Sequence, residues 1–82
     1  MDRYIVVSPH TVGDCAKVIK EVGSTGYITR FDWGCKGGEH TGWAIIEADN
    51  EAQALMAVPS SHRRHAKAIR LVKITPEEAR TL

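Results

Sequence analysis

The chain has 82 residues, 43% hydrophobic and 26% charged, and its 11 Lys and Arg against 10 Asp and Glu give a formal net charge of +1. This composition is ordinary for a folded domain and excludes a disordered, collagen-like or coiled-coil chain. Two cysteines are too few for the disulfide framework of a small secreted scaffold, and no apolar run approaches the ~20 residues that span a bilayer. We therefore expect one domain over residues 1–82, located in the cytoplasm and without a membrane partner.

The first half of the chain predicts a strand, a helix and a two-stranded hairpin. Residues 3–8 (RYIVVS) are an apolar, β-branched run closed by a proline, which indicates a strand buried on both faces. Apolar residues at helical spacing predict a helix over residues 11–22, with Thr11 as its N-cap. Alternation over residues 27–33 (YITRFDW) predicts a second strand, and a glycine-rich loop joins it to a returning strand over residues 41–48 (TGWAIIEA).

The second half predicts one more helix and one more strand. Asp49 or Asn50 caps a helix that extends to about Val58, and residues 66–74 (AKAIRLVKI) form the last strand. Thr75-Pro76 followed by two glutamates predicts a short C-terminal helix. The order β-α-β-β-α-β is that of the ferredoxin-like α+β fold. We therefore predict a four-stranded antiparallel sheet of order 4-1-3-2 with two helices on one face.

The other face of this sheet has no cover within the chain. The first strand is apolar on both faces, and Tyr27, Phe31 and Trp33 share one side of the second strand. We expect this face to be buried against a second copy, which makes the protein a homodimer.

Topology and three segments (RYIVVS, FDWGCKGGEHTGWAIIEADNEAQAL and AIRLVKIT) resemble small uncharacterised members of the dimeric α+β barrel superfamily. In that superfamily two ferredoxin-like subunits pack sheet to sheet, so the resemblance also implies a homodimer. Cofactor-independent monooxygenases and muconolactone isomerase-like enzymes belong to it. None of their catalytic motifs maps onto this chain, so no catalytic residue is carried over, and fold alone does not assign function.

The predicted topology gathers all the histidines and cysteines at one end of the sheet. These residues are His10, Cys15, Cys35, His40, His62 and His65. Imidazole nitrogen and thiolate are ligands that zinc and similar transition metals prefer. We predict a metal site, with zinc as the leading candidate, held by His10, Cys35 and His40. Cys15 lies on the apolar stripe of the predicted helix and is more typical of a core position. The simpler alternative is a set of surface histidines that hold nothing.

A small anionic molecule is a second candidate ligand for the same end. The loop between the two tryptophans is rich in glycine, which lets the backbone approach a ligand closely. The alternative is a flexible hairpin tip without a ligand. The residues expected to contact such a molecule are Trp33, Lys36, His40, Trp43, His62 and Arg63.

An enzyme is an alternative to a binding protein. Asp32 with His10 or His40 is an acid–base pair of the kind that isomerases and cofactor-free oxygenases use. A thiol role is a further option, in which Cys35 reacts and Cys15 resolves it as a disulfide. Two separate reduced cysteines are the simpler expectation in a cytoplasmic protein.

Positive charge is concentrated near the C-terminus. Residues 1–51 carry a net charge of −3, whereas residues 52–76 carry +5 and no acidic residue. The edge from Arg63 to Lys73 is therefore a candidate interaction surface for nucleic acid or protein. The aromatic signature of RNA-binding ferredoxin-like sheets is absent from residues 41–48. This favours a solvated edge that discourages strand addition over a nucleic-acid interface.

Overall fold

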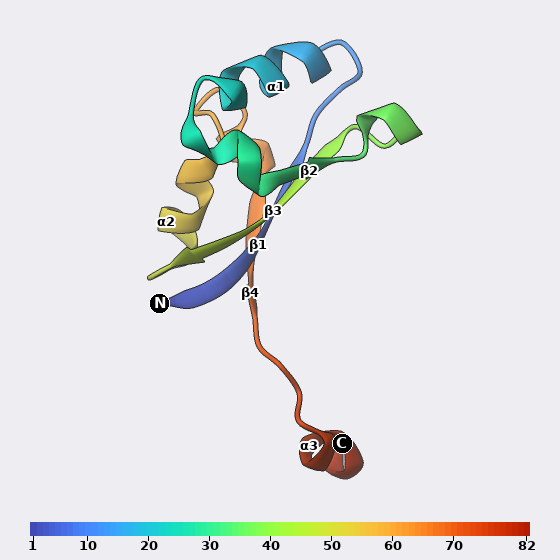
Figure 1. Ribbon diagram of the computed structural model, residues 1–82, viewed down its shortest axis with the longest axis vertical. Helices are drawn as coiled ribbons and strands as arrows, with labels where there is room; N and C mark the ends of the chain where they lie inside the picture. The colour runs from blue at the N-terminus through green and yellow to red at the C-terminus, as the bar shows by residue number, and fades with distance from the viewer.

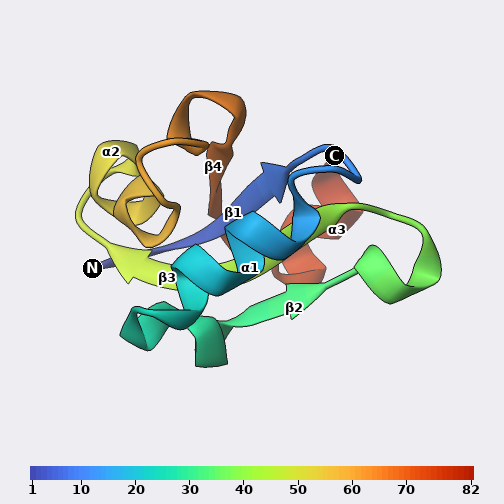
Figure 2. The same cartoon turned by 90° about the horizontal axis from the view of Figure 1, so that it is seen from above.

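One antiparallel sheet organises the chain, and a computed structural model describes it over all residues 1–82. Strand β1 (Asp2–Pro9) pairs along its whole length with β3 (Thr41–Ala48). On its other side β1 pairs with β4 (Lys67–Leu71), and β2 (Phe31–Trp33) pairs with the outer side of β3. The order β2-β3-β1-β4 confirms the predicted sheet, as Figures 1 and 2 show.

Two helices lie on one face of the sheet, and a third stands apart from it. Helix α1 (Cys15–Gly23) follows β1, and α2 (Glu51–Ala54) follows β3 and continues as a 3-10 turn. Helix α3 (Pro76–Thr81) lies at the end of an extended segment, away from the sheet and the other helices (Figure 1). This arm makes the molecule long, with extents of 46 × 28 × 21 Å. None of the helices combines the length and apolar composition that crossing a membrane requires.

The hydrophobic core lies between the sheet and the two helices. Alternate β1 residues Tyr4 and Val6 are buried there, and Val18 and Val22 of α1 pack into the same cluster. The side chains of β1 that point to the other face, such as Ile5, are only half-buried. The prediction of a strand buried on both faces is therefore wrong for the uncovered face of the isolated chain.

The helix predicted from Thr11 begins four residues later than expected. The Asp14 N–H donates to both the carbonyl and the side-chain oxygen of Thr11, so residues 11–14 close a turn of their own. Helix α1 starts only at Cys15. The consequence for the site is that Cys15 occupies the first turn of the helix.

The strand predicted over residues 27–33 is wrong in its first half. Thr25 accepts a hydrogen bond from the Tyr27 N–H and caps a 3-10 helix over Gly26–Arg30, so only Phe31–Trp33 joins the sheet. Phe31 is paired with Ala44 and is buried in the core under the helices. The aromatic side of this strand therefore faces the helical layer, not the uncovered face.

The remaining elements follow the prediction with shorter bounds. Asn50 accepts the Gln53 N–H and caps α2, and Thr75 and Glu78 form the reciprocal capping box that opens α3. The last strand was expected over residues 66–74 but pairs only over Lys67–Leu71. Beyond Leu71 the chain leaves the sheet as the exposed arm, with Val72 and Ile74 in solvent.

Candidate metal centre

The site lies where the turn after β1, the first turn of α1 and the β2–β3 hairpin meet. The last residue pair of the β1–β3 ladder is Pro9 with Thr41. One residue further, the His10 N–H donates to the His40 carbonyl over 3.0 Å, which places the two imidazoles side by side. Figure 1 shows the turn after β1 and the hairpin at the same end of the sheet.

The hairpin brings its cysteine to the same point by means of a tight 3-10 turn over Cys35–Gly37. Gly38 closes this turn in the left-handed region at φ 89°, a conformation that glycine adopts at no steric cost. Gly34 precedes it and is crowded, since a Cβ there would lie 2.7 Å from the Glu39 carbonyl oxygen. The glycines at positions 34 and 38 therefore allow the tight turn that brings Cys35 next to His10.

Four side chains converge in what we call the His/Cys cluster, namely His10, Cys15, Cys35 and His40. One ligand atom from each lies within 4.8 Å of every other, and all four residues are half-buried. The Cys35 Sγ is 3.4 Å from the His10 Nε2, and the two imidazole centroids are 6.0 Å apart. Ligand atoms around tetrahedral zinc lie roughly 3.3–3.8 Å apart, given Zn–S near 2.3 Å and Zn–N near 2.0 Å. Side-chain adjustments of about 1 Å close that difference.

The electrostatic surroundings favour the uncharged forms of two cluster members. Burial is the largest effect and lowers the pKa of His10; the Ser8 backbone opposes it, and the nearby His40 and His62 lower the pKa further. A hydrogen bond with Cys35, together with burial, raises the pKa of the Cys15 thiol. Neutral imidazole is the form that binds a metal, whereas a thiol must first lose its proton.

Two buried nitrogens in the cluster have no hydrogen-bond partner. They are the Nδ1 atoms of His10 and His40. Buried polar atoms are rarely left unpaired, because each one costs about 1–3 kcal/mol. Each imidazole of the cluster thus has a ring nitrogen without a partner, and for His10 this is Nδ1 and not the Nε2 that contacts Cys35. An ion held by an Nδ1 atom would give that atom a partner. The donor set therefore fits a zinc-like ion.

An aromatic wall supports the cluster from the sheet side. The Trp33 ring lies 6.2 Å from the His10 ring and stacks on Phe31 at 5.2 Å. Trp33 packs directly over Gly42, where a Cβ would lie 2.8 Å from the indole. Trp33, expected from the sequence to contact a ligand, thus borders the cluster and fixes the position of His10.

The predicted metal residues His10, Cys35 and His40 are all brought together, and the structure adds Cys15. The apolar stripe of the predicted helix favours a core position for Cys15. Because α1 starts at Cys15 itself, the side chain reaches the hairpin instead. Cys15 could have been included in the predicted site, because it belongs to the set of histidines and cysteines that the topology gathers at this end of the sheet.

The other expected ligand-binding residues lie in different surroundings. Arg63 donates from its guanidinium to the carbonyls of Leu55 and Val58. Lys36 is exposed, and Trp43 pairs with Val7 on the uncovered face of the sheet. His62 is buried and lies in a groove beside His10.

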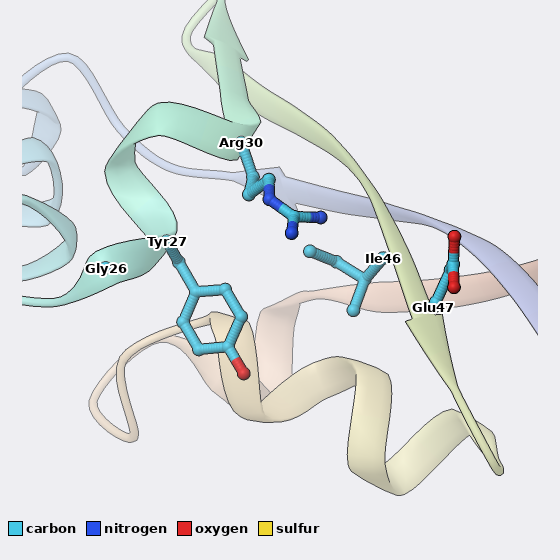
Figure 3. Close-up of a pocket in the computed structure, with 5 residues that line it drawn as sticks. All are labelled: Gly26, Tyr27, Arg30, Ile46 and Glu47. Atoms are coloured by element: carbon cyan, nitrogen blue, oxygen red, sulfur yellow. The ribbon is translucent and has the colours of Figure 1, made fainter. Parts of the chain in front are cut away.

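A separate hollow of about 390 Å³ lies between the 3-10 helix over Gly26–Arg30 and strand β3 (Figure 3). Tyr27 and Arg30 approach it from the 3-10 helix, and Ile46 and Glu47 approach it from β3. It contains no histidine or cysteine, so it is not part of the candidate metal centre.

Comparisons of the chain with protein-family models, with curated proteins and with solved structures found no match. The functional conclusion therefore depends on the geometry of the site.

Proposed function

We propose that the protein binds one zinc-like transition-metal ion through His10, Cys15, Cys35 and His40. The observation that carries this proposal is the convergence of two imidazoles and two thiols within 4.8 Å. Four protein donors complete a tetrahedral shell and leave no position open for a substrate, which is typical of a structural zinc site. The ion stabilises the fold and serves no catalytic step.

Such an ion joins three segments of the chain at one end of the sheet. It ties the turn after β1 to the first turn of α1 and both to the hairpin tip. Only 16 of the 82 residues are buried in the isolated chain, so its own core is small. The binding free energy of a structural metal adds directly to the folding free energy, so loading the site raises the melting temperature.

Elemental analysis of untagged protein, with a competition titration against a chelating dye, tests the proposal. We expect one zinc per chain, and we expect Cys35→Ser and His40→Gln each to weaken zinc binding at least about tenfold. His65→Gln is the matched control, because it removes an exposed histidine outside the cluster. Equal zinc content in the control and in both cluster variants would overturn the proposal.

We also propose that two copies pack through the uncovered sheet face, in the manner of the dimeric α+β barrels that the chain resembles. This face carries an apolar strip with Ile45 and Ile69 exposed by 44% and 46%. Arg3 of β1 and Glu47 of β3 are paired across the strands and place one positive and one negative charge beside the strip. A second copy related by a two-fold axis presents the same strip and the opposite charges, which makes the face self-complementary.

An enzyme of that superfamily type remains the alternative function. It requires a closed cavity of several hundred Å³ that shields a substrate from water. The three main hollows of the chain, of about 390, 480 and 360 Å³, are all open to solvent. Asp32, the acid of the predicted acid–base pair, is exposed on the face opposite the cluster. These observations favour metal binding over catalysis.

A further inference from the structure

A groove next to the His/Cys cluster forms a second site of different chemistry. Its volume is about 480 Å³, and apart from Pro9 its lining residues are polar or charged. One wall is the turn after β1 with the first turn of α1, and the other is the loop before β4. His10 borders both the groove and the cluster, and it is the only residue that they share.

Two positively charged side chains of the groove, Lys17 and Arg64, make no ion pair within the chain. Lys17 is exposed and makes no ion pair. The Arg64 Nε donates to the neighbouring His65 over 3.3 Å, which leaves its two terminal nitrogens without a partner in the protein. Other arginines of this region are engaged, since Arg63 binds backbone carbonyls and Arg70 pairs with an aspartate. Unengaged cations on both walls favour a negatively charged occupant.

The base of the groove is a buried histidine held in a fixed orientation. His62 is only 8% exposed. The Ser61 hydroxyl donates to a Glu21 carboxylate oxygen over 2.9 Å, so its oxygen can accept the Nδ1–H of His62 at 3.0 Å. The His62 Nε2 then faces Asp14 at 3.6 Å. Both ring nitrogens of His62 are thus engaged within the protein, so the ring forms a fixed base for the groove and the cations on the walls are the groups that can contact an anion.

We propose that the groove binds a small, doubly charged oxyanion between Lys17 on one wall and Arg64 on the other, with His62 at its base. The shared chemistry is that of a phosphate group or a dicarboxylate. Asp14 is the only acid of the lining, and its carboxylate is turned toward His62. The proposal goes beyond metal binding, because neither Lys17 nor Arg64 is a member of the cluster.

Titration of the full chain with sodium phosphate, and separately with sodium succinate, tests the proposal at constant ionic strength. The readout is the amide NMR shift of groove residues. We expect saturable shifts at Lys17 and Arg64 with at least one of the two anions, and the stronger of the two identifies the ligand class. Loss of one charge-assisted contact in Lys17→Gln or Arg64→Gln should weaken binding about tenfold.

Lys73→Gln is the matched control, because it removes the same charge from an exposed position outside the groove. We expect it to bind the anion as the natural chain does. Shifts that do not saturate, or equal weakening in Lys73→Gln and Arg64→Gln, would show general attraction to a basic surface and overturn the proposal. A Cys35→Ser chain that loses zinc but still binds the anion separates this proposal from the metal site.

Discussion

Cys15 and Cys35 are two thiols that the fold brings together from distant positions in the sequence. Both are free, half-buried thiols: Cys15 is the first residue of α1, and Cys35 begins the 3-10 turn that follows β2. A hydrogen bond with Cys35 and burial raise the pKa of the Cys15 thiol, which favours its protonated form. A metal ion and a disulfide make competing use of the same two sulfurs. Zinc at the proposed site would therefore protect the pair from oxidation.

We predict that hydrogen peroxide joins Cys15 to Cys35 in the metal-free chain and that zinc slows this reaction. The two thiols lose two electrons and two protons, and one peroxide is reduced to two molecules of water. Intact-mass analysis under non-reducing conditions should show the loss of two hydrogens per chain, with the linked peptides found after digestion. Cys15→Ser should form no internal disulfide. Separate sulfinic acids on both cysteines of the natural chain, with no linked peptide, would contradict the prediction.

At the scale of elements, hydrophobic spacing was enough to predict the order and pairing of the strands. It could not predict where α1 begins. The Asp14 N–H donates to both the side-chain and the carbonyl oxygen of Thr11, and these local hydrogen bonds close a turn before the helix starts. A local hydrogen bond has the same effect at Thr25, which accepts the Tyr27 N–H and caps a 3-10 helix where the alternating pattern predicts the first half of a strand. Three of the four cluster residues were predicted from the topology. Cys15 was missed because the error in the start of the helix also changed the direction expected for its side chain.

The hairpin offers a test of how closely backbone geometry controls the cluster. We predict that Gly34→Ala destabilises the hairpin by about 1–3 kcal/mol, because the added Cβ would lie 2.7 Å from the Glu39 carbonyl oxygen. The shift moves Cys35, so zinc affinity should fall together with stability. Urea denaturation and chelator competition measure the two effects.

Gly37→Ala is the matched control for Gly34→Ala. It lies in the same hairpin, and nothing comes within 4 Å of the added Cβ. We expect this variant to keep both the stability and the zinc affinity of the natural chain. If Gly34→Ala behaved like this control, backbone crowding at Gly34 would have no part in positioning Cys35.

At the scale of the whole molecule, apolar side chains are exposed both on the C-terminal strand β4 and on the arm that follows it. Ile69 is exposed on the uncovered face of the sheet, and Val72 and Ile74 are exposed on the arm that leads to α3. A small chain buries little apolar surface in its own core, so covering these exposed side chains adds a large share to its stability. A second copy covers the sheet face in both molecules at once, which is the physical reason for expecting a homodimer.

We predict that the natural chain is a dimer and that Ile45→Lys converts it to a monomer at micromolar concentration. Ile45 is paired with Ile5 at the centre of the face, so a lysine there would bury two charges against each other across the two-fold axis. Sedimentation velocity measures the mass. Met56→Lys is the control, since Met56 is 57% exposed but lies in the helical layer. A natural chain that sediments as a monomer at every concentration would exclude this interface, and the open sheet face would then need another partner.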